Sequence, residues 1–196
     1  MFCTKETFKR VLFSPTLADK NQSHKIAYIA VMTAFIVAAN MFFEFKLAET
    51  QFSLTLAISA LTGLIIGPLF GFVACFLGDL VGFLYNSAGF AYLPWIGISM
   101  GTVALISGLI AAIPLKIKGS TYIKLALISL LTFALCTVAI NTTAFWLLYS
   151  KVPYGTYLIS RLFVQGQIWN SLFNYGLLFI FVPVLSKVKA LKLQLS

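Results

Sequence analysis

Long apolar stretches separated by short polar segments dominate the pattern of hydrophobic and polar positions along this 196-residue chain. The apolar stretches cover residues 26–43, 52–66, 69–85, 94–115, 122–148 and 157–185. Most of them approach or exceed the roughly 20 residues that an α-helix needs to cross the hydrocarbon core of a bilayer. The pattern therefore predicts an all-α integral membrane protein, a bundle of six transmembrane helices.

The second and third stretches are short and are separated only by Gly67-Pro68. A single helix over residues 52–85 would be about 50 Å long, which is more than a bilayer can hold. A Gly-Pro pair commonly marks a turn, so we expect two helices that reverse there. A re-entrant pair of short helices beside four full spans is an alternative, and it keeps the same ends of the chain on the same sides.

Composition and charge agree with a lipid environment. The chain is 60% hydrophobic and 10% charged, whereas a soluble domain carries about 25% charged residues. Fourteen basic residues face five acidic ones. If both termini are cytoplasmic, eleven of the basic residues lie inside: Lys5, Lys9, Arg10, Lys20, Lys25, Lys116, Lys118, Lys124, Lys187, Lys189 and Lys192. Only Lys46, Lys151 and Arg161 then lie outside, so the positive-inside rule explains the charge better than nucleic-acid binding does.

The predicted organisation has three parts. Residues 1–25 form a cytoplasmic tail, residues 26–186 the transmembrane domain, and residues 187–196 a basic cytoplasmic tail. The first part lacks the uninterrupted apolar core of a signal peptide. Within it, residues 8–13 read either as a short amphipathic piece on the inner membrane surface or as disordered chain.

Polar side chains gather in the outer parts of the third, fifth and sixth stretches. Asp79 is the one acidic residue well inside a predicted span, and an intramembrane acid is a functional candidate by default. Its alternative role is a structural partner for a polar group such as Asn141. Arg161 and Gln165 begin the sixth stretch. These residues are candidate ligand contacts, although interhelical hydrogen bonding would also explain them.

Aromatic residues are dense on the same predicted outer side. Tyr85, Trp95 and Trp146 are the candidates that we single out from this group. An interfacial aromatic belt is the usual reason for such a distribution. A pocket that stacks a flat heterocycle is the functional alternative.

Small residues recur at intervals of four. Ala30, Ala34 and Ala38 share one face of the first helix, and small residues at this spacing let another helix approach closely in lipid. That helix belongs either to this bundle or to a separate membrane subunit. The glycine pairs Gly78/Gly82 and Gly97/Gly101 have the same spacing and predict a tightly packed bundle.

Several kinds of chemistry have no motif in the sequence. It contains neither a phosphate-binding G-x-x-x-x-G-K-[ST] loop nor an H-E-x-x-H or G-x-S-x-G motif. His24 is the only histidine, so a histidine-based zinc site is not expected. We therefore predict no catalytic residues, cofactor or metal. Uphill transport would need a partner that hydrolyses ATP, or an ion gradient.

Three stretches resemble the substrate-capturing S components of energy-coupling-factor (ECF) vitamin importers. The first is AYIAVMTAFIVA at residues 27–38, which contains the alanine stripe, and the second is residues 64–82, which contains Asp79. The third combines NTTAFW at residues 141–146 with RLFVQ at residues 161–165. The second and third look most like the folate branch of this family.

The resemblance implies a six-helix bundle that binds a vitamin near its outer face and has no ATPase activity. It implies association with a membrane coupling (T) subunit and two ATPase subunits. It also assigns the alanine stripe to docking on the coupling subunit. At matching positions, it implies that Asp79, Asn141, Arg161 and Gln165 contact the vitamin.

We therefore predict a subunit of an ATP-driven importer in the plasma membrane of a prokaryote, with folate as the leading ligand. Riboflavin, thiamine, cobalamin and a queuosine precursor are alternative ligands. The rival function is a stand-alone secondary transporter in which Asp79 binds a proton or cation.

Overall fold

The computed structural model describes residues 12–47, 50–85, 92–115 and 119–187, and within these ranges the fold is mainly helical. The bounds of the elements are α2 Pro15–Ala18, α3 Gln22–Phe42, β1 Glu44–Leu47, β2 Thr50–Ser53, α4 Thr55–Ile66, α5 Pro68–Tyr85, α6 Pro94–Ala112, α7 Ser120–Thr132, η1 Phe133–Thr142, α8 Thr143–Tyr149, α9 Tyr154–Ile159, η2 Ser160–Val164 and α10 Gln167–Ser186. The π-helical segments η1 and η2 interrupt the α-helical ones.

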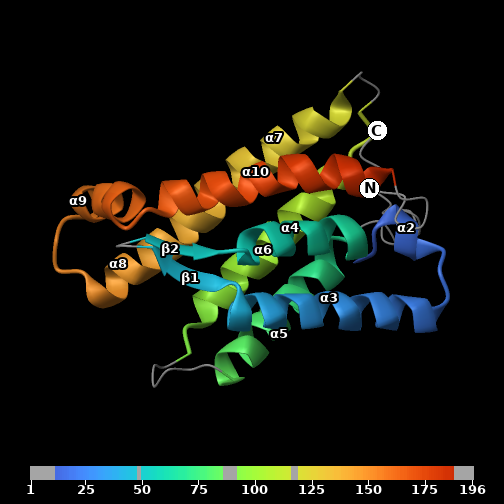
Figure 1. Ribbon diagram of the computed structural model, residues 1–196, viewed down its shortest axis with the longest axis horizontal. Helices are drawn as coiled ribbons and strands as arrows, with labels where there is room; N and C mark the ends of the chain where they lie inside the picture. The colour runs from blue at the N-terminus through green and yellow to red at the C-terminus, as the bar shows by residue number, and fades with distance from the viewer. Residues whose placement is uncertain (1–11, 48–49, 86–91, 116–118, 188–196) are drawn as a thin grey trace, which may run out of the picture.

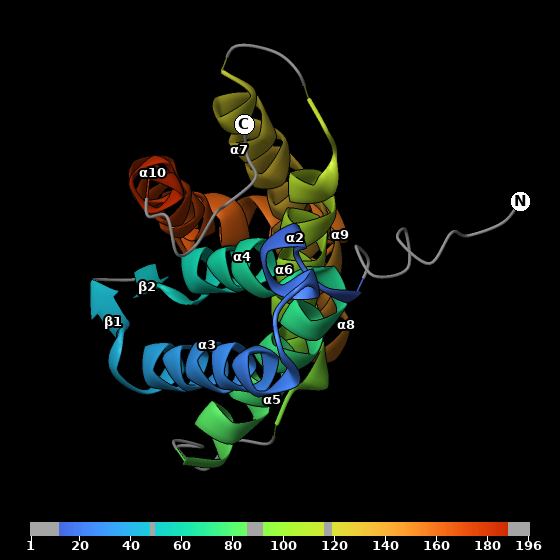
Figure 2. The same cartoon turned by 90° about the vertical axis from the view of Figure 1, so that its right-hand side faces the viewer.

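Five helical segments are long and apolar enough to cross a membrane: α3, α5, α6, the continuous run α7–η1–α8, and α10. The second predicted span, residues 52–66, is short in the structure, because α4 has 12 residues and is therefore only about 18 Å long. It lies at the centre of the bundle, where it packs against α3, α5, α6 and α10 (Figure 2). Nine of its residues are buried, so α4 serves mainly as a core element.

Glycines bring α4, α5 and α6 into close contact. A Cβ atom at Gly63 would overlap the backbone carbonyl of Ala104, and one at Gly108 would lie 2.6 Å from the backbone nitrogen of Pro68. Between α4 and α5, a Cβ atom at Gly71 would lie 3.1 Å from Cα of Gly63. Small residues thus permit backbone-to-backbone packing. This is expected in a bilayer, where the hydrophobic effect does not drive helices together and close van der Waals contact does.

The turn expected at Gly67-Pro68 is present. Gly67 has φ 119°, which only glycine adopts readily, and it separates α4 from α5. The backbone preceding α2 covers this turn, since Ser14 donates from its N–H to the carbonyl of Ile66 and from its hydroxyl to the carbonyl of Ile65. Because α4 ends within the bundle, these bonds satisfy carbonyl groups that would otherwise lack partners in lipid. The stretch predicted as an amphipathic piece, residues 8–13, falls mostly outside the described residues.

A β-hairpin occupies the segment between the first two predicted spans. Strands β1 and β2 pair antiparallel, with Glu44 opposite Ser53 and Leu47 opposite Thr50. The second apolar stretch was expected to be helical from Phe52, but Phe52 and Ser53 belong to β2. The helix therefore begins at Thr55.

The sixth apolar stretch was expected to form one helix over residues 157–185, and this was wrong. Gly166 has φ 71° and separates the short segment α9–η2 from α10. The left-handed backbone at Gly166 lets the chain change direction there. As Figure 1 shows, α8, α9 and the hairpin lie at one end of the bundle, whereas α2 and the last turns of α10 lie at the other.

Candidate functional site

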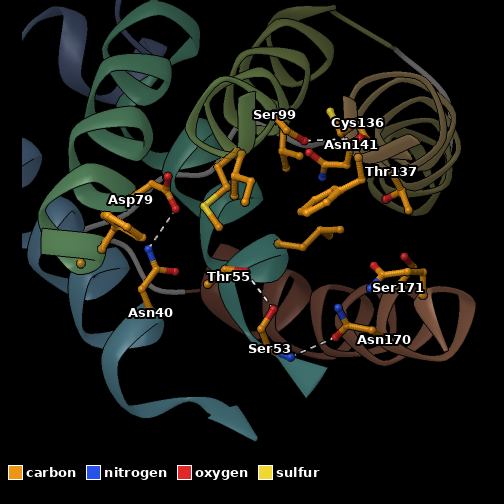
Figure 3. Close-up of a pocket in the computed structure, with 18 of the residues that line it drawn as sticks. Asn40, Ser53, Thr55, Asp79, Ser99, Cys136, Thr137, Asn141, Asn170 and Ser171 are labelled. Atoms are coloured by element: carbon orange, nitrogen blue, oxygen red, sulfur yellow. Dashed lines mark hydrogen bonds between the residues drawn. The ribbon is translucent and has the colours of Figure 1, made fainter. Parts of the chain in front are cut away.

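A cavity of about 320 Å³ lies at the end of the bundle that carries the hairpin. Residues from α3, β2, α4, α5, α6, η1, α8, η2 and α10 line it. Figure 3 shows the polar side chains that surround it: Asp79 and Asn40 on one wall, Ser99, Thr137 and Asn141 on a second, and Asn170 and Ser171 on a third. Met100 and Val103 add an apolar surface. The cavity thus combines hydrogen-bonding groups with apolar walls, which is typical of small-molecule sites.

The first wall is organised around the carboxylate of Asp79, which is 6% exposed. Asn40 of α3 donates from Nδ2 to Oδ1 at 3.3 Å, and Tyr92 donates from its hydroxyl to Oδ2 at 3.0 Å. Burial, followed by the charge of Asp79 and the hydrogen bond to it, raises the pKa of Tyr92. The hydroxyl therefore stays protonated and acts as a donor to the carboxylate.

Two glycines make room for this arrangement. A Cβ atom at Gly82 would lie 2.9 Å from Cβ of Asn40, and one at Gly97 would lie 2.6 Å from the hydroxyl oxygen of Tyr92. The same atom at Gly97 would lie 3.1 Å from Oδ2 of Asp79. The glycine spacing seen in the sequence therefore serves this wall directly, because it lets both donors approach the carboxylate.

The second wall comes from η1, a ten-residue π-helix. Within it the hydroxyl of Thr142 donates to the carbonyl of Thr137, five residues earlier, at 2.7 Å. From α6, the hydroxyl of Ser99 donates to the carbonyl of Cys136 at 3.4 Å. Oδ1 of Asn141 is buried and has no hydrogen-bond partner within the described part of the chain. π-Helical turns are frequent at functional sites, and here one presents Thr137 and Asn141 to the cavity.

Arg161 brings a guanidinium group to the cavity from η2, and its side chain is 8% exposed. Its guanidinium carbon lies 4.2 Å from the ring centroid of Phe145, a cation–π contact. Burial lowers the pKa of Arg161, and a hydrogen bond with Tyr157 opposes that effect. Nε of Arg161 is buried without a hydrogen-bond partner among the described residues. An acceptor atom of a ligand would satisfy such a donor.

The third wall joins α10 to the hairpin. Oδ1 of Asn170 accepts a hydrogen bond from the N–H of Ser53 at 3.1 Å, and Nδ2 of Asn174 donates to the carbonyl of Ser53 at 2.7 Å. The hydroxyls of Ser53 and Thr55 lie 2.9 Å apart. The end of β2 is therefore part of the cavity wall. Within the described ranges, no three His, Cys, Asp or Glu side chains gather closely enough to hold a metal ion.

The sequence of this chain matches the profile of a known protein family. A sequence profile described as the S component of the ECF-type riboflavin transporter matches residues 20–191. The chain belongs to this family of ECF-type S components. No curated protein matches the chain by sequence.

Solved structures show the same fold for this S component. Eight chains match. One of them, a crystal structure of FolT bound with folic acid, superposes with a TM-score of 0.65 at 20% sequence identity. The match covers 82% of this chain and 93% of that one. The family match and the apolar helices together identify the chain as a multi-pass membrane protein that is a component of a transporter.

Three of the seven residues predicted to contact the ligand line the cavity of the S component: Asp79, Asn141 and Arg161. They come from the third, fifth and sixth apolar stretches, which were expected to lie close together at this end of the bundle. The suggested pairing of Asp79 with Asn141 is not seen among the described hydrogen bonds of Asp79, which involve Asn40 and Tyr92.

The other four predicted contacts lie outside the cavity wall. Tyr85 is 77% exposed at the end of α5, and Gln165 is exposed in the turn before Gly166. Nε1 of Trp146 donates to the carbonyl of Val152 at 2.8 Å. Trp95 is partly buried, and its Nε1 has no partner within the described ranges. Their contact with a ligand stays a prediction.

Several polar residues of the wall were not recognised from the sequence: Asn40, Ser53, Thr55, Ser99, Thr137 and Ser171. Asn40 is the clearest omission, since it lies near the C-terminal end of α3, among the apolar residues of its last turns. Polar residues within apolar helices are a general sign of interior contacts. That sign could have identified Asn40 and Ser99. It could not have identified Ser53, which reaches the wall through the hairpin.

Proposed function

We propose that this S component captures a small heterocyclic vitamin in the cavity and delivers it through an ATP-driven importer. The observation that carries the proposal is a polar cavity with the Asp79 carboxylate on one wall and the Arg161 guanidinium on another. A carboxylate accepts strong hydrogen bonds from ring N–H and amino groups. Arginine binds a carboxylate or another acceptor in a fixed geometry. Phe83 and Phe145, which also line the cavity, offer ring faces for stacking.

Folate is the leading ligand in this proposal, and riboflavin is the second. Folate combines an amino-substituted ring, suited to Asp79, with carboxylates suited to Arg161, and the structural neighbour with the same fold carries folic acid. Riboflavin is favoured by the description of the matching family. It also has a flat heterocycle, but it has no carboxylate for Arg161.

Isothermal titration calorimetry of the purified protein with folic acid, riboflavin, thiamine and cobalamin tests the ligand. Binding of folic acid with little binding of riboflavin supports the leading proposal, and the reverse supports the second. Loss of binding in Arg161→Met, a change that removes the charge and keeps an apolar chain over Phe145, would locate the ligand in this cavity. An intact protein that binds none of the four compounds would contradict the proposed vitamin class.

The proposed partners are a membrane coupling (T) subunit and two ATPase subunits. Ala30 and Ala34 are exposed on α3, and Ala38 is partly buried, whereas Ile36 and Ala39 of the same helix are fully buried. The described bundle therefore leaves most of the small-residue stripe uncovered. A helix of the coupling subunit could approach closely along it. We propose Ala30, Ala34 and Ala38 as this docking surface.

Ala34→Leu tests docking because the added bulk should keep a partner helix away. We expect vitamin uptake by cells that carry the whole importer to be lost, whereas vitamin binding by the purified subunit stays unchanged. Ala126→Leu is the matched control, since Ala126 is exposed on a different helix, α7. Full uptake by Ala34→Leu would exclude the stripe as an essential contact.

The proposed topology places both termini in the cytoplasm of a prokaryote, with the cavity facing outward. The start of α3, which carries Lys25, and the end of α10, which Lys187 follows, belong to the α2 end of the bundle, whereas Lys151 lies between α8 and α9 and Arg161 in η2, directly after α9; α8 and α9 lie at the hairpin end (Figure 1). With residues 1–25 and 187–196 taken as inner tails, the basic residues follow the positive-inside rule. Reporter fusions at each terminus test this arrangement. Accumulation of vitamin by liposomes that contain only this chain would instead support the secondary-transporter alternative.

A further inference from the structure

Two asparagines of α10 connect the hairpin to the cavity. Asn170 lines the cavity, as Ser53 of β2 does. Asn174, one turn further along α10, is 0% exposed. The two side chains together hold both backbone polar groups of Ser53: Oδ1 of Asn170 accepts from its N–H, and Nδ2 of Asn174 donates to its carbonyl. The end of β2 is therefore attached to α10 by side-chain amides.

The orientation of the Asn170 amide follows from its partners. A backbone N–H can only donate, so the Asn170 atom that lies 3.1 Å from the nitrogen of Ser53 must be Oδ1. The same oxygen accepts from Nδ2 of Asn174 at 3.1 Å. Both acceptor positions of Oδ1 are thereby used on the hairpin side. Nδ2 of Asn170 makes no hydrogen bond to the described part of the chain, and it is the donor that this residue can offer to a ligand.

Asn174 is oriented in turn by the backbone of α4. Its Oδ1 accepts from the N–H of Ala57 at 2.9 Å. Ala57 lies in the first turn of α4, whose N-cap residue Leu54 has no side chain able to cap it. Asn174 thus caps α4 from another helix. With its oxygen used in this way, its Nδ2 faces the carbonyl of Ser53 and both oxygens of Asn170.

We propose that Asn170 and Asn174 form an amide relay that couples ligand binding to the attachment of the hairpin. Asn170 donates from Nδ2 to an acceptor atom of the ligand and holds the N–H of Ser53 through Oδ1. Asn174 is the positioning residue that, together with the N–H of Ser53, holds this orientation. The inference rests on the proposed function, because it takes the cavity as the vitamin site. It adds a requirement for a carbonyl oxygen or unprotonated ring nitrogen on the ligand beside α10.

Electronic polarisation of the amide gives the relay a direction. When an acceptor binds Nδ2 of an amide, electron density shifts toward its oxygen, and that oxygen becomes a better acceptor. Ligand binding therefore strengthens the bond from Ser53 to Asn170. By thermodynamic reciprocity, an attached hairpin favours the bound ligand to the same extent.

Hydrogen–deuterium exchange of the full chain in detergent, with folic acid and with riboflavin as separate probes, tests the relay. In the wild type, the vitamin that binds should slow exchange in the peptide around Ser53 several-fold. In Asn174→Ala, this ligand-dependent slowing should disappear, and the dissociation rate of the vitamin should rise about tenfold, as expected for loss of a small hydrogen-bond network. A protein that was merely less stable would exchange faster overall but would keep the response to ligand.

Asn141→Ala is the matched control, because it also removes an asparagine from the cavity wall but has no described bond to the hairpin. It should weaken binding and preserve the slowing of exchange at Ser53 once the ligand is saturating. If Asn174→Ala does not fold, Asn170→Ala replaces it, since that variant leaves Asn174 in place to cap α4. Ligand-dependent slowing at Ser53 in Asn170→Ala equal to that in the wild type would overturn the relay.

Exchange measured on the ligand-free proteins tests the attachment of the hairpin independently of which vitamin binds. Exchange at Ser53 should be at least about threefold faster in Asn170→Ala than in Asn141→Ala, as expected for loss of one net hydrogen bond. Equal rates would overturn the attachment on which the relay depends. A wild type that binds neither vitamin would instead contradict the proposed ligands, and the ligand-free arm would still decide whether Asn170 holds the hairpin.

Discussion

The half of the bundle near α2 and the half near the hairpin both depend on glycine, but they use it differently. Near α2, Gly63, Gly71 and Gly108 let the backbones of α4, α5 and α6 touch. Near the hairpin, Gly82 and Gly97 make room for the side chains of Asn40 and Tyr92, which reach Asp79. In the first half the missing Cβ atoms give close helix contacts, and in the second they give space for a polar site. The same residue type therefore supports two different structural roles.

The contrast predicts that replacing glycine by alanine lowers the free energy of unfolding most in the half near α2. Gly63→Ala would place a Cβ atom against the backbone carbonyl of Ala104, and a backbone cannot rotate away as a side chain can. We expect the free energy of unfolding to fall by about 3 kcal/mol, the upper part of the usual cost of overpacking. Thermal unfolding in detergent, with denaturant titration to obtain the free energy, measures this.

Gly176→Ala is the control for that prediction. Gly176 lies in α10, and a Cβ atom there would have nothing within 4 Å. It should leave stability unchanged or raise it slightly, because alanine favours helix more than glycine does. Equal stability of the two variants would contradict backbone-to-backbone packing at Gly63.

In the half near the hairpin, the largest expected effect is on ligand affinity. Asp79→Asn keeps an oxygen for the bond from Asn40, and the hydroxyl of Tyr92 can accept from the new amide, so the fold should persist. Loss of charged hydrogen bonds to the vitamin should raise the Kd at least tenfold, since each such bond contributes about 1.5–3 kcal/mol. Calorimetric titration with folic acid and riboflavin measures it. The control is Asp19→Asn, which removes an exposed carboxylate near α2 and should not change the Kd.

Gly97→Ala sharpens the comparison because it repeats the glycine-to-alanine change beside the cavity. The new methyl group would meet the hydroxyl end of the Tyr92 side chain, which can move. The cost in stability should therefore be about 1 kcal/mol, below that of Gly63→Ala, while affinity falls several-fold as Tyr92 leaves Asp79. Both quantities come from the same unfolding and titration measurements. A stability loss as large as that of Gly63→Ala would show that the two halves do not differ in this respect.

The smallest expected effect concerns one hydrogen bond between helices away from the cavity. The hydroxyls of Thr132 on α7 and Tyr175 on α10 lie 3.0 Å apart. Thr132→Val keeps the shape of the side chain and should cost about 0.6 kcal/mol of stability, the average for such bonds in membrane proteins. It should not alter the Kd. Thr102→Val, which removes an exposed hydroxyl bonded only within its own helix, is the control and should change neither quantity.

Much of the fold follows from local sequence. Apolar stretches give the helices α3, α5, α6 and α7–η1–α8 to within a few residues at most ends, because burial in lipid requires long, uncharged helices with internally satisfied backbones. Gly67-Pro68 marks the turn between α4 and α5 because φ 119° suits glycine and few other residues. The break at Gly166 was missed because the apolar residues before Gln165 and after Gln167 continue the helical pattern, and a single glycine within such a pattern is compatible with an unbroken helix.

The candidate site was only partly accessible to the same reasoning. The cost of placing a charge in the membrane marks Asp79 in any apolar helix, so its selection needed no tertiary information. Arg161 and Asn141 were selected from polar patches at the expected outer ends of helices. Ser53 was not selected, because its place in the wall depends on a contact with Asn170, which lies 117 positions away in the sequence.

By itself, the sequence of this S component determined the solvent in which it folds and the positions of its apolar stretches, and its charges are the basis of the proposed sidedness. These properties depend on local hydrophobicity and charge, which each segment carries alone. The tertiary structure decided which glycines form the packed core, which surround Asp79, and how the hairpin joins the cavity. Those outcomes depend on distances between separate helices, and no single segment contains them.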